Sequence, residues 1–468
     1  MNKTGFIAIF ILCMFAHQIW AQQNYSIEPL SLNSSFTEEI YAFPYDEGLI
    51  YSSDRRTHIL VSRVDSANRP LFHLFYVPAG KDSVKWGTPQ LLSKNIPINA
   101  NQGPFSISAD GRELYYSFND VTGQRIYSTG RSGSGWGNVR PFAHNRPNYT
   151  TTHPSLSRNG QRLFFASDIP GGYGGFDIYV CERTRTGWGQ PKNLGPTVNT
   201  SENELYPFIQ ANGELFFSSN GHGSMGGMDI FSAREIAGEW GMVHQMEAPI
   251  NSAADDISFT VADADGTHGY FASNRAGKSF DLYSFKSLFP AFNDCREQEE
   301  NEYGVYEFQE NTAMGLDTTT LKLVWDMGDG TIKHGEVVEH TFPSAGHYEI
   351  RLSVVDTLTN EITQNVASYP FDVLDVEQPY ITTAETVQAG VMTAFDASET
   401  NLPDVDIEEY YWMFGDGTRA RGKHADHVYA VPGVYQVRLG VIGKSKYTGE
   451  QMKECVFLEI TVQPSDTP

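Results

Sequence analysis

The segment Arg158-Asn159-Gly160-Gln161-Arg162-Leu163-Phe164-Phe165-Ala166-Ser167 decides the fold of the first part of the chain, because its pattern recurs. In each copy a polar residue and a glycine precede an apolar strand that ends in small residues. The turn glycines of the five copies are Gly48, Gly111, Gly160, Gly213 and Gly266. Asp-Gly and Asn-Gly between strands are typical of tight hairpins, since these turns require positive φ angles. The repeat therefore predicts one β-hairpin in roughly every 50 residues.

A Trp-Gly pair marks a second position in the same repeat. At spacings of 50, 52 and 52 residues, it begins at Trp86, Trp136, Trp188 and Trp240. A third apolar segment follows each hairpin, as in Phe176–Tyr179 and Met228–Phe231. Each repeat thus holds four short strands, and four-stranded units of about 50 residues are typical of propeller blades. We expect five blades across residues 22–290, in which the four tryptophans are structural.

The two ends of this region indicate how the ring of blades closes. The segment Ile27–Asn33 resembles Gln190–Gly195, which follows a Trp-Gly pair, whereas the last repeat has no Trp-Gly. We expect the N-terminal strand to complete the last blade, because unpaired strand edges favour aggregation. The repeats resemble the WD-repeat-like propeller repeats of the TolB type over most of residues 25–290.

A different repeat occupies the C-terminal part of the chain. Val324-Trp325-Asp326-Met327-Gly328-Asp329-Gly330 is matched 87 residues later by Tyr411-Trp412-Met413-Phe414-Gly415-Asp416-Gly417. His340 and His427 follow at the same offset, and each is followed by a segment that alternates polar and apolar residues. Such alternation predicts half-buried antiparallel strands. In the Gly-Asp-Gly turns, Asp329 and Asp416 can accept hydrogen bonds from backbone N–H groups.

This second pattern closely resembles polycystic-kidney-disease (PKD) domains, and its two copies make the resemblance specific. It implies immunoglobulin-like sandwiches with Trp325 and Trp412 in their cores. The expected fold is all-β: a five-bladed β-propeller followed by two immunoglobulin-like (PKD) β-sandwiches. The expected domains are residues 22–290, 291–378 and 379–468, with Asp294–Glu300 as a linker.

Residues 1–21 have the features of a cleaved signal peptide. Lys3 precedes the apolar run Phe6–Phe15, and a cut after Ala21 would leave Gln22 at the mature N-terminus. A retained membrane anchor is the alternative, but the run is too short to cross a bilayer comfortably. Cys13 lacks the small neighbours of a lipoprotein signal. We expect an exported protein without a transmembrane segment, which is periplasmic, associated with the outer membrane, or extracellular.

Negative charge is concentrated in the C-terminal part of the chain. Residues 22–290 have a net charge of −5 and residues 291–468 a net charge of −20, against −24 for the whole chain. Such a surface repels nucleic acid and anionic lipids. It favours solubility, with divalent-cation binding or a basic partner as the alternatives.

Three cysteines remain after the signal segment, namely Cys181, Cys295 and Cys455. An odd number cannot all pair within one chain. Cys181 follows an apolar strand and is interpreted as a small buried residue. Disulfides are not expected to hold this protein together.

A search for chemically active groups returns few candidates. The sequence has no Gly-x-Ser-x-Gly, no His-Glu-x-x-His and no phosphate-binding Gly-Lys-Ser/Thr motif. The glycine-rich segment Gly171–Gly175 is interpreted as a blade loop. Three aspartates recur at equivalent positions in the blades, which favours a structural hydrogen-bonding role: Asp177, Asp229 and Asp281.

Two groups in the last domain could hold a metal ion. His424 and His427 flank Asp426, but His427 fills a position of the PKD motif. Oxygen ligands suitable for Ca²⁺ are offered by Asp404, Asp406, Glu408 and Glu409. A solvated acidic loop is the expected interpretation, and no cofactor is expected.

Two classes of function remain open. The first is a non-catalytic envelope protein that binds a protein or glycan and acts as a monomer or within a larger complex. Its domain pairing resembles exported proteins of the Bacteroidota envelope. Specificity is expected in the loops around Arg55–Pro70, Gly171–Gly175 and Gly221–Gly227, with Tyr173, His222 and Met225 as partner-binding candidates. The alternative is a hydrolase or lyase with its site in the propeller channel. A cluster of different His, Asp and Glu side chains at the channel mouth would favour this alternative.

Overall fold

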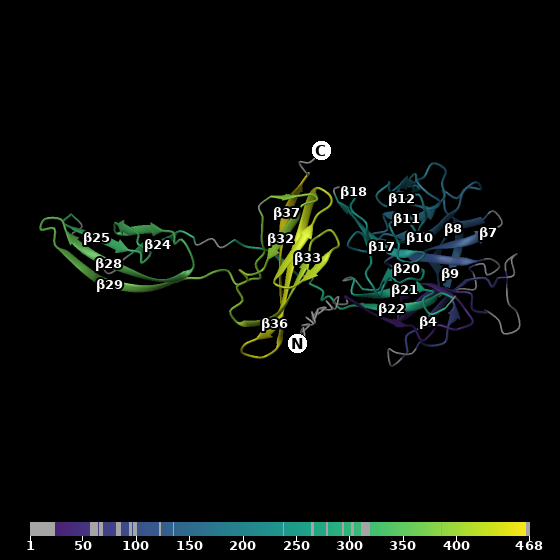
Figure 1. Cartoon of the computed structure of the whole chain (residues 1–468), viewed down its shortest axis with the longest axis horizontal. Coiled ribbons are helices and arrows are strands. Elements are labelled where there is room, and N and C mark those ends of the chain that lie inside the picture. The colour runs from purple at the N-terminus through teal and green to yellow at the C-terminus, as the bar shows by residue number, and fades with distance from the viewer. Residues whose placement is uncertain are drawn as a thin grey trace, which may run out of the picture. The chain divides into compact units, whose positions relative to one another are not determined.

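All regular structure in the described part of the chain is β-strand (Figure 1). The computed structural model describes residues 24–56, 64, 69–80, 86–92, 96, 101–120, 123–133, 135–236, 238–263, 266–277, 279–292, 294–300, 304–309, 319–384 and 386–464. Two compact units divide the chain between Ala291 and Phe292. The predicted signal peptide and its cleavage site after Ala21 lie outside the described residues. Within these ranges the all-β prediction is confirmed, and no helix has the length and apolar character needed to span a bilayer.

The first unit contains five antiparallel sheets in its described residues. The first sheet is formed by β2 (Glu39–Tyr45), β3 (Gly48–Ser53), β4 (His73–Pro78) and β5 (Gln90–Leu91). The second is formed by β6 (Gln102–Ile107), β7 (Glu113–Asp120), β8 (Gly123–Ser132) and β9 (Gly135–Pro141). The third is formed by β10 (Thr151–Leu156), β11 (Arg162–Ser167), β12 (Asp177–Thr184), β13 (Gly187–Trp188) and β14 (Lys192–Asn193).

The fourth sheet repeats the strand order of the third. It is formed by β15 (Glu204–Ile209), β16 (Glu214–Ser219), β17 (Asp229–Ile236), β18 (Glu239–Trp240) and β19 (His244–Gln245). The fifth sheet joins the two ends of the unit, and it is formed by β20 (Asp256–Val261), β21 (His268–Ser273), β22 (Asp281–Ser287) and β1 (Tyr25–Pro29). In the second to fifth sheets the turn between the first two strands uses a glycine at positive φ, for example 68° at Gly160 and 86° at Gly213. In the first sheet Asp46 has the positive φ, 48°. This geometry is the reason for the recurring Asn-Gly and Asp-Gly.

The first strands of the five sheets contact one another in a closed order, β2–β6–β10–β15–β20–β2. Five hydrophobic clusters lie between neighbouring sheets and close the same ring. Successive side chains of a strand point to opposite faces. Phe164 therefore packs against the fourth sheet, and Phe165 packs against the second. Both faces of these strands are buried, which explains the continuous apolar runs of the repeat.

The N-terminal strand closes the ring as predicted. β1 pairs antiparallel with β22, from Tyr25 opposite Ser287 to Pro29 opposite Tyr283. Just after β1, the Asn33 side chain donates to the Leu282 carbonyl at 2.8 Å and accepts the Leu282 N–H at 3.0 Å. Asn199 and Asn251 likewise form two hydrogen bonds each, with the backbone N–H and carbonyl of Ile178 and Ile230 in the third strands of the third and fourth sheets. The N-terminal segment thus supplies both the outer strand of the fifth sheet and the asparagine that bonds its third strand.

The second unit contains the two sandwiches. The first sandwich is formed by β24 (Tyr306–Gln309), β25 (Leu321–Asp326), β26 (Ile332–His334), β27 (Val337–His340), β28 (Gly346–Asp356) and β29 (Ile362–Val373). The second contains β30 (Thr382–Thr383), β31 (Val387–Gln388), β32 (Met392–Asp396), β33 (Val405–Met413), β34 (Arg419–Arg421), β35 (His424–Val428), β36 (Gly433–Ser445) and β37 (Gln451–Gln463). As the motif predicts, Trp325 and Trp412 are buried in the two cores, with 1% and 0% of their surface exposed. Their indole N–H groups donate to the carbonyls of Gly335 and Gly422.

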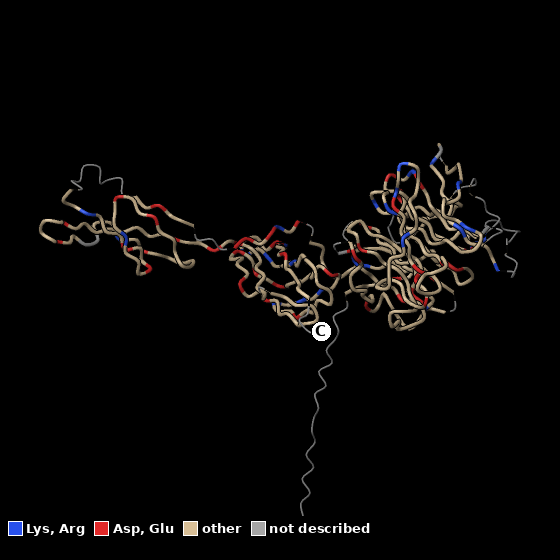
Figure 2. The backbone as a smooth tube through the Cα atoms, turned by 90° about the horizontal axis from the view of Figure 1, so that it is seen from above, with Lys and Arg blue, Asp and Glu red and all other residues tan. Residues whose placement is uncertain are grey.

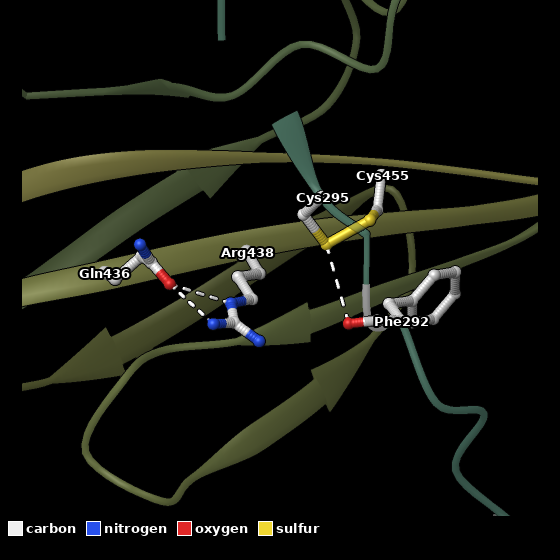
Figure 3. Close-up of a disulfide and its surroundings, with 5 residues drawn as sticks. All are labelled: Phe292, Cys295, Gln436, Arg438 and Cys455. Atoms are coloured by element: carbon white, nitrogen blue, oxygen red, sulfur yellow. Dashed lines mark hydrogen bonds between the residues drawn. A yellow bond between two sulfur atoms is a disulfide. The ribbon is translucent and has the colours of Figure 1, made fainter. Parts of the chain in front are cut away.

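The segment predicted as a linker is instead part of the second sandwich. Strand β23 (Arg296–Glu297) pairs in parallel with β37, with Arg296 opposite Val456. Cys295 and Cys455 form a disulfide beside this pairing (Figure 3). The expectation that disulfides do not help to hold this protein together is therefore wrong, whereas Cys181 is buried and free as expected.

Local packing explains why this segment is held. A Cβ atom on Gly440 would lie 2.3 Å from the Phe292 ring, so the absence of a side chain in β36 makes room for Phe292. Gln298 exchanges two hydrogen bonds with the Ile381 backbone. The second sandwich is therefore built from two stretches of chain, residues 292–300 and 378–463, and the first sandwich is inserted between them. This arrangement differs from the expected boundaries at residues 291 and 379.

Candidate binding site on the propeller

Two glycine-rich loops of the propeller have the same construction. We call residues 170–176 and 220–228, which connect the second and third strands of the third and fourth sheets, the glycine loops. Asp177 accepts the N–H groups of Tyr173 and Gly174 at 2.7 and 3.1 Å. Asp229 accepts those of Met225 and Gly226 in the same way. Asp281 holds the equivalent register, opposite Ser273, in the fifth sheet. At Asp177 and Asp229 the carboxylates hold the loops in place, which is the hydrogen-bonding role that their repetition predicts.

The glycines allow these loops to pack closely against the next sheet. A Cβ atom on Gly174 would lie 2.3 Å from the Glu202 carbonyl oxygen, and one on Gly226 would lie 2.1 Å from that of Ala254. Any side chain at either position would separate neighbouring sheets. The glycines therefore serve contact between blades, which agrees with the interpretation of Gly171–Gly175 as a blade loop.

The residues before these glycines present apolar side chains to solvent. Tyr173 and Met225 are 52% and 53% exposed, and each lies four residues before the aspartate that holds its loop. Their backbone is fixed by the hydrogen bonds described above, so two apolar groups are displayed on rigid supports. The structure thus brings two of the three predicted partner-binding residues to equivalent positions in adjacent sheets.

The third candidate, His222, is placed differently. Its Nε2 atom lies 2.9 Å from the Val198 carbonyl oxygen, and its ring packs against Phe217 and Phe231. The ring is therefore held by these contacts inside the propeller and is not displayed with Tyr173 and Met225. Of the further loop predicted at Arg55–Pro70, residues 57–63 and 65–68 lie outside the described residues.

The centre of the ring contains a feature that sequence reasoning missed. Each inner strand has a bulge, and three of the bulges contain non-glycine residues at positive φ: His153 at 52°, Tyr206 at 52° and Ser258 at 59°. The His153 and Tyr206 rings stack with their centroids 4.0 Å apart, and the Tyr206 N–H donates to His153 Nδ1 at 3.2 Å. Tyr206 also packs against the clusters on both sides of the first sheet, across the axis from its own strand. These two rings therefore lie across the propeller axis. The residues at the bulges are unlike one another, which hides their equivalence in the sequence.

Burial determines the protonation of this pair. It lowers the pKa of His153 to about 3, and it raises the pKa of Tyr206 to about 12 with a further contribution from the Glu38 carboxylate. Both side chains are consequently neutral near pH 7. His153 also uses Nδ1 to accept a backbone hydrogen bond. The pair can pack and form hydrogen bonds, but neither side chain has a pKa near 7, as a proton-transfer group at neutral pH would need.

We expect acid to destabilise the propeller through His153. The pKa is about 3 when folded and near 6.5 when unfolded, so the unfolded state binds the extra proton and stability falls as pH drops below about 6.5. Between pH 6.5 and 4.5 the loss would approach about 2.5 kcal/mol. His153→Asn, which tolerates positive φ, should therefore show a smaller decrease in melting temperature between pH 7 and 4.5 than the unaltered protein.

His222→Asn is the matched control, because His222 also has positive φ but is only partly buried. It should retain the full acid sensitivity. Equal losses of melting temperature in His153→Asn and the unaltered protein would contradict the assignment.

In the sandwiches, the Gly-Asp-Gly turns form histidine–aspartate pairs. Asp329 and Asp416 each accept the N–H of the threonine two residues later, and each lies 2.8 Å from Nε2 of the motif histidine, His340 or His427. Burial acts to raise the pKa of Asp416, but the hydrogen bonds from His427 and Thr418 outweigh it and lower that pKa. The same balance lowers the pKa of Asp329. These pairs hold the turns, as the motif position of His427 indicates.

The predicted calcium ligands are not gathered into a site. Asp404 accepts a hydrogen bond from the Tyr447 hydroxyl at 3.0 Å, and Glu408 forms an ion pair with Lys444 at 2.5 Å. Glu409 accepts a hydrogen bond from the Tyr411 hydroxyl. Asp406 is exposed on β33. Over the residues that the structure describes, no group of three or more His, Cys, Asp or Glu side chains is placed to hold a metal ion. His424 lies 3.0 Å from Asp396 and apart from the His427 pair.

Comparison with known families finds one domain twice in the second unit, and the first match includes strand β23, which pairs with the second sandwich. Residues 290–368 and 376–455 match the family model described as PKD domain. Both sandwiches match the PKD domain. The PKD domains thus account for the repeated tryptophan and Gly-Asp-Gly motifs that the sequence shows at 87-residue spacing.

Solved structures resemble the chain only distantly. The putative TolB of Agrobacterium tumefaciens has 14% identity and a TM-score of 0.34, covering 72% of this chain and 81% of its own. The TolB of Acinetobacter baumannii has 10% identity and a TM-score of 0.29, with coverages of 84% and 63%. The catalytic domain of a Coprinopsis cinerea GH62 α-L-arabinofuranosidase has 12% identity and a TM-score of 0.38, with coverages of 57% and 97%. Likenesses this distant do not extend to activity or ligands.

Proposed function

We propose that the chain is a non-catalytic binding protein of the cell envelope, whose propeller engages a protein or glycan through the glycine loops. The observation that carries the proposal is the rigid display of Tyr173 and Met225, each about half exposed, on loops held by Asp177 and Asp229. Aromatic and methionine side chains are enriched in interfaces, and rigid supports reduce the entropy lost on binding.

A non-catalytic role is supported by the centre of the propeller. The alternative is a hydrolase or lyase in the channel. The stacked rings of His153 and Tyr206 lie across that channel, and the low pKa of His153 leaves it neutral near pH 7. His153 Nδ1 is already used by the Tyr206 N–H. This arrangement favours a structural role for the His153–Tyr206 pair.

Action outside the cytoplasm is supported by the second unit. Disulfides persist mainly in oxidising compartments, and Cys295–Cys455 connects residues 160 positions apart. Acidic residues are distributed along the chain of both sandwiches (Figure 2), in the region with a net charge of −20. We infer that the PKD pair forms an acidic spacer that repels nucleic acid and anionic lipid.

The experiment replaces both displayed residues. A Tyr173→Ser, Met225→Ser variant should lose at least about tenfold in affinity, because central apolar anchors typically contribute more than about 1.4 kcal/mol. The partner would first be identified by photo-crosslinking from positions 173 and 225 in the host envelope. The affinity of the purified partner or glycan would then be measured for each variant.

Met242→Ser is the matched control, because Met242 is 50% exposed and lies outside the glycine loops. It should bind as the unaltered protein does. Equal affinity of the double variant and this control would refute the glycine loops as the binding surface. Turnover of a glycoside or ester by the purified protein would refute the non-catalytic assignment.

A further inference from the structure

A cavity of about 400 Å³ lies on the propeller axis, and all five sheets contribute to its lining. It lies where the first strand of each sheet turns into the second, whereas the glycine loops join the second and third strands at the other end. We call it the axial cavity. Its apolar lining comes from the inner strands of all five sheets and consists of Phe43, Ile107, Leu156, Phe208 and Val261. The volume falls within the range usual for small-molecule sites, about 300–1,000 Å³.

Charged side chains surround this apolar lining, and most of them have partners within the protein. Asp110 accepts the Ser108 hydroxyl at 2.6 Å and the Arg112 N–H at 3.0 Å. Asp263 accepts the Thr267 N–H at 2.8 Å. Arg131 donates to the Tyr45 hydroxyl at 2.5 Å and lies 3.9 Å from Asp46. The carboxylates of the rim therefore each have a donor or a cation nearby.

Arg158 is the exception among the described residues of the rim. It follows β10 in the turn that begins the recurring segment, it lines the axial cavity, and its side chain is exposed. No described group forms a hydrogen bond or ion pair with its guanidinium. An arginine whose five donors are free at the polar rim of a cavity that is partly lined by apolar side chains is well suited to bind a carboxylate in bidentate geometry.

We propose that the axial cavity binds a small ligand with an apolar body and a single carboxylate, which pairs with Arg158. The apolar lining would bury the body of the ligand, because burial of apolar surface is favourable in proportion to its area. The neighbouring Asp46, Asp110 and Asp263 disfavour ligands of higher negative charge through like-charge repulsion. The carboxylate belongs either to a free organic acid or to the C-terminus of a peptide with an apolar last residue. This site is independent of the glycine loops.

The test compares an acid with its neutral analogue by calorimetry on the full chain. Hexanoate should bind at least about tenfold more tightly than hexanamide, since a charge-assisted hydrogen bond is lost in the amide. In Arg158→Gln this preference should disappear. Arg185→Gln removes the same charge from an exposed position of the same sheet that does not line the cavity, and it should retain the preference. Unchanged melting temperatures would show that both variants are folded.

Two peptides distinguish the source of the carboxylate. Acetyl-Ala-Leu with a free C-terminus binding more tightly than hexanoate would indicate a peptide C-terminus, and the reverse order would indicate a free organic acid. In either case the amidated peptide should bind weakly. The proposal is overturned if acid and amide bind equally, if Arg158→Gln keeps the preference, or if hexanoate gives no binding heat at millimolar concentration.

Discussion

A chain that lacks residues 25–36 will fail to form a cooperatively folded propeller. The deletion removes all five residues of β1, so that β22 loses its outer partner from Tyr283 to Ser287 and pairs only with β21. It also removes Leu30 and Leu32, which are buried between the first and fifth sheets. Loss of a buried leucine typically costs about 2–5 kcal/mol, and a domain is stable by only about 5–15 kcal/mol. The exposed edge of β22 would in addition favour aggregation.

Calorimetry and size-exclusion chromatography would measure this outcome. We expect the propeller transition to disappear or to move down by more than about 10 °C, with the protein eluting as aggregates. Phe36→Ala is the control, because Phe36 lies in the deleted segment but is 93% exposed. It should leave melting unchanged. A monomeric truncated protein with the original transition would show that the N-terminal strand does not close the ring.

Trp412→Ala will unfold the second sandwich and leave the propeller intact. Trp412 is fully buried, its indole N–H donates to Gly422, and its ring packs near Phe395 and Phe414. Replacing such a side chain by alanine typically costs about 3–5 kcal/mol, which is most of the stability of a small sandwich. Trp325→Ala should have the same effect on the first sandwich, where Trp325 is 1% exposed.

Limited proteolysis with mass spectrometry would locate the damage. In Trp412→Ala, cleavage should begin within residues 378–463, and the propeller transition in calorimetry should stay in place because the two units have separate cores. Trp412→Phe is the matched control, since it keeps an aromatic ring and should lose much less stability. Proteolysis confined to the propeller, or a propeller that melts together with the sandwich, would contradict this result.

The repeats made most of the fold predictable. The positive φ of the turn glycine is a property of one hairpin, and the continuous apolar run Leu-Phe-Phe indicated that both faces of the strand after it are buried. The missing Trp-Gly of the last repeat indicated closure by the N-terminal strand, and the motifs around Trp325 and Trp412 indicated two sandwiches. Tyr173 and Met225 were chosen as candidates because blade loops vary while the strands repeat, and the structure shows that their loops are built alike.

Tertiary structure alone decided the rest, because those contacts join residues that are far apart and unlike one another. Cys295 meets Cys455 only because Phe292 fits above Gly440 and β23 lies along β37. His153 and Tyr206 occupy equivalent bulges, yet nothing in their sequence neighbourhoods shows that their rings stack on the propeller axis. The axial cavity likewise takes one wall from each sheet, so that Arg158 lies beside a cavity only when the ring closes. Local patterns determine which strands form, whereas the path of the whole chain determines which side chains share a site.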